Sequence, residues 1–433
     1  MSPIAVGVLG VAAMLTLMLL RMPIGFAMAV VGFVGMSSIA SVEAGLNLIG
    51  TQFYASLSSY TFTVLPLFVF MGFIAFKSGI TKRLYDSAYK LMGSLPGGLA
   101  MASIAACAGF SAICGSTTAT AATIGTVAIP EMKKYSYDPG YYTGAIAAGG
   151  LLGVMIPPSL AFIVYGSLTE QSIAKLFVAG ILPGLVLATL FMGVAYTLAR
   201  LNPALAPRGP RASLREKLAA IPRGGTDTMI IFGVVMGGMF AGVFAPTEAA
   251  AVGVAVTFLI ALSRRELTWK GFKDALLASL ETSAMLYVVI AGAMIFGRFI
   301  ALSKIGLLLG NYVADLQLPS FVVLWAMVAV YLVLGCLMDT ISMILITLPI
   351  FFPMAMQLGY DPIWFGVVIV IMMEMGAITP PVGINVFVVS GLAKDVPTSR
   401  IFKGVMPYVV ALLILLATLE VFPQIALFLP SLM

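Results

Sequence analysis

The feature that most constrains this chain is a succession of continuous apolar runs, each long enough to cross a lipid bilayer. Only 9% of the 433 residues are charged, whereas soluble domains average about 25%. The length accommodates about ten spans of about 20 residues, the length that a hydrocarbon core requires. Apolar and polar residues do not alternate along these runs, which excludes the strands of a membrane β-barrel. The sequence therefore predicts an all-α polytopic membrane protein.

The residue types that are missing exclude several kinds of chemistry. The chain has no histidine, so a Ser-His-Asp triad, a His-ligated metal and a His proton relay are ruled out. An intramembrane protease would need an Asp pair or a Ser–Lys pair, and Asp339 and Asp361 have no accompanying motif. The three cysteines, Cys107, Cys114 and Cys336, lie in apolar segments and are expected to be buried small side chains. We therefore expect neither an enzyme nor an organic cofactor.

The chain carries an internal repeat with an offset of 223 residues. Tyr137-Asp138-Pro139 recurs as Tyr360-Asp361-Pro362, and Pro157-Pro158 recurs at the same separation as Pro380-Pro381. One ungapped offset that aligns a tripeptide and a double proline indicates a duplication. The repeats are predicted over 1–199 and 227–433, joined over 200–226 by a basic, proline-rich cytoplasmic linker that includes Arg211.

The basic clusters predict how the two halves cross the membrane. The net charge of +6 comes from short clusters between apolar runs, as the positive-inside rule predicts, so we expect no nucleic-acid partner. Both ends of 97–132 carry basic clusters, which leaves either two full crossings or a re-entrant hairpin with a small, polar tip. Its counterpart, 320–355, lacks basic flanks and is predicted to enter from outside. The sequence therefore predicts two inverted-topology repeats, an arrangement typical of secondary transporters.

Each predicted hairpin is followed by a broken helix, over 141–168 and 362–392, that contains the double proline. Two consecutive prolines remove two amide donors and disrupt the helix in mid-span. The carbonyls left without partners suit a cation, and the half-helix that follows points its amides at the same place, which suits an anion. Each break therefore predicts a sodium site beside a carboxylate site, although a double proline is also compatible with a kink that binds nothing.

Three charged residues in apolar surroundings allow two interpretations each. Asp339, at the tip of the second hairpin, is compatible with a cation ligand or a helix cap. Glu374 is an intramembrane carboxylate, which is functional by default, but a polar contact between helices would also account for it. Arg298 either faces a substrate carboxylate or extends towards the membrane surface.

Two further segments are predicted to lie along surfaces. Residues 264–281 are basic and amphipathic and favour a cytoplasmic interfacial helix. Residues 43–58 are predicted to form a matching arm outside.

Four motifs give the chain a family resemblance: Gly109-Phe-Ser-Ala-Ile-Cys-Gly-Ser-Thr-Thr-Ala-Thr120, Ile156-Pro-Pro-Ser159, Pro246-Thr-Glu-Ala-Ala250 and Ile378-Thr-Pro-Pro-Val-Gly-Ile-Asn385. Through these motifs the chain resembles the large membrane (M) subunit of TRAP transporters, the tripartite ATP-independent periplasmic family. The resemblance covers essentially the whole chain. The resemblance implies a multi-pass protein of the bacterial inner membrane. It also implies an elevator mechanism, in which a transport domain holding both hairpins slides against a scaffold.

The resemblance further implies sodium-driven uptake of an organic acid, with two protein partners besides the lipid bilayer. These are a small four-span membrane (Q) subunit, expected here as a separate chain, and a periplasmic substrate-binding (P) protein. The sodium candidates lie between each tip and its broken helix: Ser111, Gly115, Ser116, Thr117, Thr118, Gly153, Ile156, Pro157, Gly335, Asp339, Thr340, Gly376, Thr379 and Pro380. The substrate candidates are Ser116, Thr117, Ser159, Asp339, Thr340 and Asn385. The alternative is a sodium- or proton-coupled dicarboxylate carrier that works without a binding protein.

Overall fold

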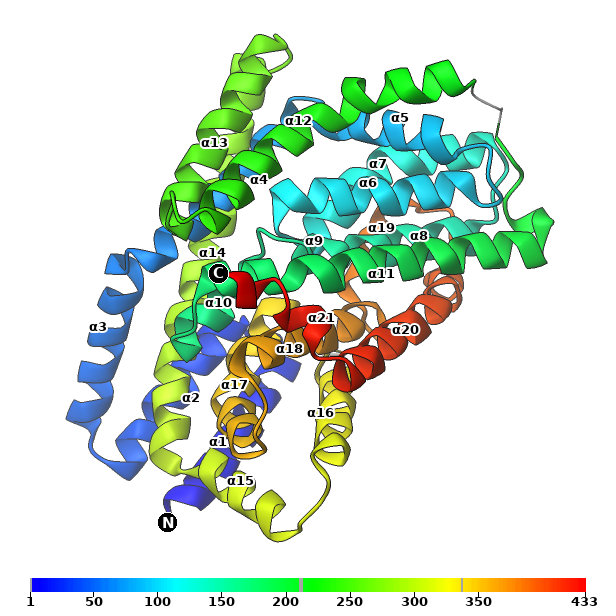
Figure 1. Ribbon diagram of the computed structural model, residues 1–433. Helices are drawn as coiled ribbons and strands as arrows, with labels where there is room; N and C mark the ends of the chain where they lie inside the picture. Colours follow the sequence, from blue (N-terminus) through cyan, green and yellow to red (C-terminus); the bar gives the residue numbers. More distant parts are fainter. Residues whose placement is uncertain (1, 210–212, 336–337) are drawn as a thin grey trace.

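The computed structural model describes residues 2–209, 213–335 and 338–433, and every regular element in them is a helix (Figure 1). The predicted all-α architecture is therefore confirmed. Two residues named above, Arg211 and Cys336, lie outside the described residues. The first half contains α1 (Pro3–Leu19), α2 (Ile24–Ile39), α3 (Val42–Ser58), α4 (Val64–Lys77), α5 (Ile80–Met92), α6 (Gly98–Cys114), α7 (Thr117–Lys134), α8 (Pro139–Gly150), α9 (Leu152–Met155), α10 (Leu160–Thr169) and α11 (Ile173–Leu201).

The second half begins with α12 (Leu214–Phe240) and α13 (Pro246–Ser263). It continues with α14 (Trp269–Ser303), α15 (Ile305–Asp315), α16 (Ser320–Gly335), α17 (Thr340–Gln357), α18 (Pro362–Ile378), α19 (Ile384–Leu392), α20 (Thr398–Val421) and α21 (Gln424–Leu427). Three short 3-10 turns, Thr61–Thr63, Pro203–Leu205 and Pro430–Leu432, complete the described elements.

Several of these helices have the length and the apolar character of membrane spans. Within the described residues, six are long and apolar enough to cross a membrane, or seven if the bent pair Val42–Ser58 and Thr61–Lys77 counts as one span. Shorter apolar helices of 10–17 residues, such as α6 and α16, accompany them. The count is below the ten that the length accommodates because hairpins and breaks divide several apolar runs into shorter helices.

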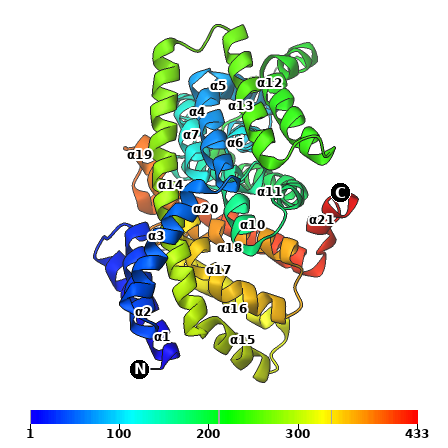
Figure 2. The ribbon, with the colours of Figure 1, turned by 90° about the vertical axis from the view of Figure 1, so that its left-hand side faces the viewer.

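The helix bounds follow the offset of 223 residues found in the sequence. The helix after the first tip, Thr117–Lys134, has its counterpart in Thr340–Gln357, and the half-helix Leu160–Thr169 has its counterpart in Ile384–Leu392. In both views, the hairpin α6–α7 lies in the upper part of the molecule and the hairpin α16–α17 in the lower part (Figures 1 and 2). The two hairpins therefore lie in different parts of the molecule, and the inverted topology of the two repeats stays a prediction.

Two predicted segments differ from what the structure shows. The predicted linker over 200–226 is helical at both ends, because α11 continues to Leu201 and α12 starts at Leu214. Ser213 starts α12 with a capping box, in which its hydroxyl accepts from the Glu216 amide and the Glu216 carboxylate accepts from the Ser213 amide. The predicted interfacial helix over 264–281 is not separate either. Most of it forms the start of the 35-residue helix α14, which runs along one side of the molecule in both views (Figures 1 and 2).

The interrupted helices lie at the centre of the protein. The apolar window of Pro139–Thr169 is 100% buried, and every residue of α18 from Ile363 to Ile378 is buried. A helix that is apolar on all sides is stable only inside a protein or in lipid. Here, neighbouring helices cover the first break, so its unpaired backbone groups can be satisfied within the protein, whereas Pro380 and Pro381 of the second break are exposed.

The two halves are held together by close backbone contacts and ion pairs. A Cβ on Gly404 of α20 would lie 1.9 Å from the carbonyl oxygen of Gly140 in α8, so only glycine permits this approach. Beside it, Lys133 Nζ lies 2.5 Å from Asp395 Oδ1, and Arg400 Nη2 lies 2.6 Å from Asp138 Oδ2. The hydrogen bond from Lys133 lowers the pKa of the Asp395 carboxyl. The first hairpin and its broken helix are thereby tied to the start of α20.

We predict that Gly404→Ala lowers the apparent melting temperature in detergent by several degrees, because overpacking at a backbone contact costs about 1–3 kcal/mol. The matched control is Gly193→Ala in α11, where no atom lies within 4 Å of an added Cβ. This control should be neutral or slightly stabilising. Equal melting temperatures for the two variants would contradict the close approach of α8 and α20.

Candidate functional site

The first hairpin tip rests directly on the first helix break. α6 ends at Cys114 and is capped by Gly115, whose φ of +67° favours glycine, and α7 starts after the extended residue Ser116. The amide of Leu160, at the start of the half-helix beyond the prolines, donates to the carbonyl oxygen of Gly115 at 3.3 Å. A Cβ on Gly153 would lie 2.4 Å from the carbonyl oxygen of Ser116. The structure thus places the candidates Gly115 and Ser116 of the first tip against the first break, where Gly153 lies.

The prolines of this break leave carbonyl oxygens available there. Because Pro157 and Pro158 have no amide hydrogen, the carbonyls of Gly153 and Val154 lack their helical i+4 donors. Ile156 and Pro157 are buried, so bulk water is not at hand. Ser159 caps the half-helix that follows, since its hydroxyl accepts from the Phe162 amide at 3.4 Å. Carbonyl and hydroxyl oxygens at a broken helix are the groups that hold sodium in transporters.

The second tip meets the second break in the same way, with a closer backbone contact. A Cβ on Gly335 would lie 2.2 Å from the Cα of Gly376, so α16 and α18 touch through glycines. Thr379 follows the last residue of α18, and its hydroxyl donates to the Met375 carbonyl at 2.6 Å. Unlike Pro157, Pro380 is exposed. The two breaks therefore share a plan but differ in their access to solvent.

Asp339 has the geometry of a helix cap. Its Oδ2 accepts from the Ser342 amide at 3.2 Å, and its Oδ1 accepts from the Ser342 hydroxyl. This geometry matches the cap interpretation, and the role of a cation ligand stays a prediction. Thr340, the first residue of α17, is half-buried beside it.

A buried pair joins the first tip to the second broken helix. The hydroxyl of Thr117 lies 2.9 Å from Glu374 Oε1 and 3.0 Å from Oε2. Glu374 is 1% exposed, and Thr117 is the one side-chain donor that it meets within the described residues. The Asn385 amide nitrogen, at the start of α19, donates to the Ala147 carbonyl of α8 at 2.9 Å. The sequence identified Glu374 and Asn385 as candidates but not the residues that they contact. The offset of 223 residues relates a position in the first repeat to the same position in the second, whereas Thr117–Glu374 and Asn385–Ala147 join different positions of the two repeats.

A cavity of about 560 Å³ opens beside the first tip. Its polar lining is made of hydroxyl groups from the tip, from α7 and from α14, and its other walls are mainly apolar and come from α4, α6 and α19. Among the described residues that line it there is no charged side chain. The hydroxyl-bearing residues are Ser116, Thr118, Thr123, Thr126 and Thr282.

The other predicted substrate residues do not share this cavity. Asp339 lines a smaller cavity of about 360 Å³ between α17, α2 and α14. Thr117 turns inward to Glu374, and Asn385 and Ser159 are fully buried. The sodium candidate Ser111 does not face this cavity either, since its hydroxyl donates to the Cys107 carbonyl at 2.5 Å within α6. Of the substrate candidates, only Ser116 lies on the cavity with the hydroxyl lining.

Two interrupted helices that meet two hairpin tips inside an all-helical apolar chain define a membrane transport protein. A family model described as the DctM component of tripartite ATP-independent periplasmic transporters matches residues 11–425. The chain therefore belongs to this family, as its motifs predicted.

The comparisons with individual proteins agree with this assignment. The chain is 36% identical to the C4-dicarboxylate TRAP transporter large permease protein DctM of Pseudomonas aeruginosa, over 88% of each chain. It is 31% identical to the sialic acid TRAP transporter large permease protein SiaM of Vibrio cholerae, over 96% of this chain and 97% of that one. The solved structure of Neisseria gonorrhoeae MtrF, described as one of a class of antimetabolite efflux pumps, has the same fold. It matches with a TM-score of 0.58 at 18% identity, over 89% of this chain and 84% of that one.

We predict that Thr117→Val destabilises the protein by about 1–3 kcal/mol, because it leaves the buried Glu374 carboxyl without its hydroxyl donor. The cost should shrink in a Glu374→Leu background, where no polar group is left unpaired. The coupling is measured with the double-mutant cycle from apparent melting temperatures. Thr118→Val, at the neighbouring tip residue that does not contact Glu374, is the control and should show no coupling. Additive effects of Thr117→Val and Glu374→Leu would contradict the link between tip and break.

Proposed function

We propose that this chain is the large permease subunit of a secondary transporter that imports an organic acid across the bacterial inner membrane. The two relatives described above are named for C4-dicarboxylates and for sialic acid, and both classes are carboxylic acids. A small Q subunit in the membrane and a periplasmic binding protein that delivers the substrate complete the proposed transporter.

The observation that carries the proposal is the chemistry of the cavity beside the first tip. Its hydroxyl groups can hydrogen-bond a carboxylate, but the described residues that line it include no Lys or Arg. An anion that leaves water for such a cavity needs a positive charge nearby. Sodium held by the backbone oxygens of the tip and the break, around Ser116 and Gly153, would supply that charge. Binding of substrate and sodium would then depend on each other, which is the basis of sodium symport.

The same packing supports an elevator movement. Each tip contacts its own broken helix through backbone atoms, so hairpins and breaks can move as one body. The two tip cavities are bounded on the other side by α14, at Thr282 for the first and at Ala284–Val289 for the second. α14 packs with α2 through glycines, since a Cβ on Gly292 would lie 2.1 Å from the Gly25 carbonyl oxygen. The proposed sliding surface is therefore the face of α14 that lines both cavities.

We predict that liposomes containing this chain and its small membrane partner accumulate labelled organic acid when three conditions are met. These are an inward sodium gradient, the cognate binding protein and an acid from a panel that includes succinate, sialic acid and gluconate. Replacing sodium with potassium should abolish accumulation, because the cavity would lose its counter-charge. Uptake that ignores the sodium gradient would contradict the coupling. Sodium-driven uptake that needs no binding protein would favour the stand-alone carrier.

We predict that Thr118→Val raises the KM for uptake about tenfold, the factor expected for one lost hydrogen bond to a carboxylate. Thr189→Val in α11 makes the same chemical change on an exposed helix face and should leave KM unchanged. Initial rates at saturating sodium give both values. If Thr189→Val and Thr118→Val behave alike, the cavity beside the first tip is not the substrate site.

A further inference from the structure

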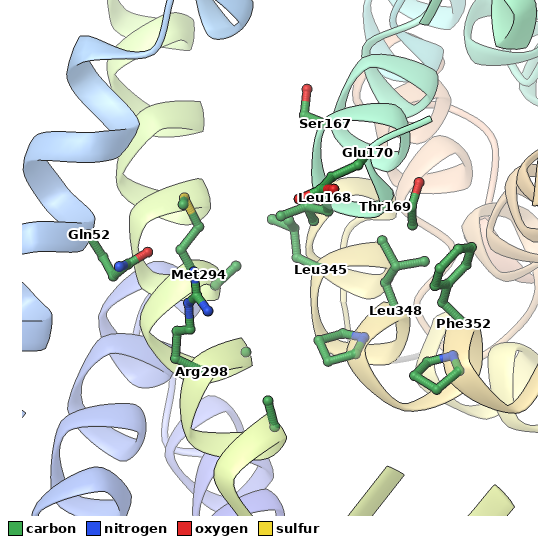
Figure 3. A pocket seen from close by; sticks show the side chains of 15 residues that line it. Gln52, Ser167, Leu168, Thr169, Glu170, Met294, Arg298, Leu345, Leu348 and Phe352 are labelled. Atoms are coloured by element: carbon green, nitrogen blue, oxygen red, sulfur yellow. The ribbon is translucent and has the colours of Figure 1, made fainter. Parts of the chain in front are cut away.

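A second cleft, of about 410 Å³, lies between two walls that belong to different parts of the fold. One wall comes from α3 and α14 and carries Gln52 and Arg298. The other comes from the end of α10 and from α17 and carries Ser167 and Glu170 (Figure 3). Thr282, which lines the cavity beside the first tip, precedes Arg298 by 16 positions on the same helix, or about 24 Å at 1.5 Å per residue. The cleft is thus separate from that cavity.

The cleft holds one positive and one negative side chain that do not pair with each other. Both Arg298 and Glu170 are exposed, and neither takes part in a salt bridge or a side-chain hydrogen bond within the described ranges. Figure 3 shows them on opposite walls. A guanidinium fork is suited to bind a carboxylate through two hydrogen bonds. An ionised Glu170 can only accept hydrogen bonds.

Two further polar atoms in the cleft lack partners. Gln52 Oε1 and Ser167 Oγ are shielded from solvent and make no hydrogen bond, and both residues line the cleft. Buried polar atoms normally have a partner, so each such exception calls for a ligand or a water molecule. Like Glu170, the amide oxygen of Gln52 requires a donor.

We infer that this cleft binds a small organic acid with a single carboxylate and several hydroxyl groups. The carboxylate lies against Arg298, and the hydroxyls donate to Glu170, Gln52 and Ser167. An unsubstituted dicarboxylate fits poorly, because it has no hydroxyl donors and its second carboxylate would face the like charge of Glu170. This inference goes beyond the proposed function, because it adds to the tip cavity a second, separate site for hydroxylated monocarboxylates such as sugar acids.

The test measures whether a ligand protects Arg298 from a dicarbonyl reagent. The full chain, with its small membrane partner, is placed in phosphatidylcholine nanodiscs and treated with phenylglyoxal. Modification of Arg298 is followed by peptide mass spectrometry. Arg265, which is exposed and makes no ion pair with the residues that the structure describes, is followed in the same samples. The probes are gluconate, hexanoate, which has the same length and charge but no hydroxyls, and succinate.

We predict that gluconate protects Arg298 at a concentration about tenfold or more below that of hexanoate, the factor that one hydrogen bond to a charged group provides. Arg265 should react at the same rate throughout. Glu170→Gln should reduce the advantage of gluconate and improve protection by succinate, since it removes the opposing charge. Because the side chain of Glu170 is exposed, this variant is expected to fold.

Several results would overturn the inference. They are no protection by gluconate, equal protection of Arg298 and Arg265, succinate acting better than gluconate, and protection by added phosphatidylglycerol alone, which would indicate a lipid contact. The assay needs no transport, sodium gradient or binding protein. A chain that fails to transport can therefore still show protection, and a chain that transports without protection refutes only this inference.

Discussion

The rest of this structure depends on how the backbone is satisfied at two helix breaks in an apolar molecule. Hydrocarbon offers no hydrogen-bond partners, so each unpaired carbonyl or amide at membrane depth costs several kcal/mol. The hairpin tips supply part of the compensation, as in the hydrogen bond from the Leu160 amide to the Gly115 carbonyl. A tip and its break are therefore one unit, and neither is stable at that depth without the other. What remains unpaired, the carbonyls upstream of the prolines, is available to an ion.

The two units are also joined to each other. The Thr117 hydroxyl crosses from the first tip to Glu374 in the second broken helix, and Asn385 crosses back to Ala147. A movement of one tip alone would therefore separate a buried polar group in the other half from its hydrogen-bond partner. The lost hydrogen bond would cost free energy unless both units move together. This argues for a single body that carries both sites, in preference to two halves that open independently.

Much of this architecture could be predicted from the sequence, because a duplicated chain must place equivalent elements at a constant offset. The hairpins and breaks, including α7 and its counterpart α17, lie where that offset puts them. The contacts between the halves could not be predicted, because Glu374 aligns with Leu151 and no sequence pattern connects it to Thr117. Helix continuity was also missed. The charges of 264–281 indicate a surface but do not show that the backbone continues unbroken into α14. The linker at 200–226 was likewise predicted from charge and proline, whereas the Ser213 capping box starts a helix within it.

α14 is the element through which these observations combine. Its counterpart in the first half, α3 with α4, bends by 57° at the intervening turn, whereas α14 stays straight enough to form one side of the molecule (Figure 2). Along this single helix lie the first tip cavity at Thr282, the second at Ala284–Val289 and the cleft with Arg298. α17 runs beside it, with Asp339 at the second cavity and Leu345 at the cleft. In the proposed elevator movement, this unbroken helix would offer the hairpins and breaks a continuous surface with no backbone break of its own to satisfy. The two copies that the offset relates therefore differ here in backbone continuity, because the first bends at its turn and the second continues as one helix.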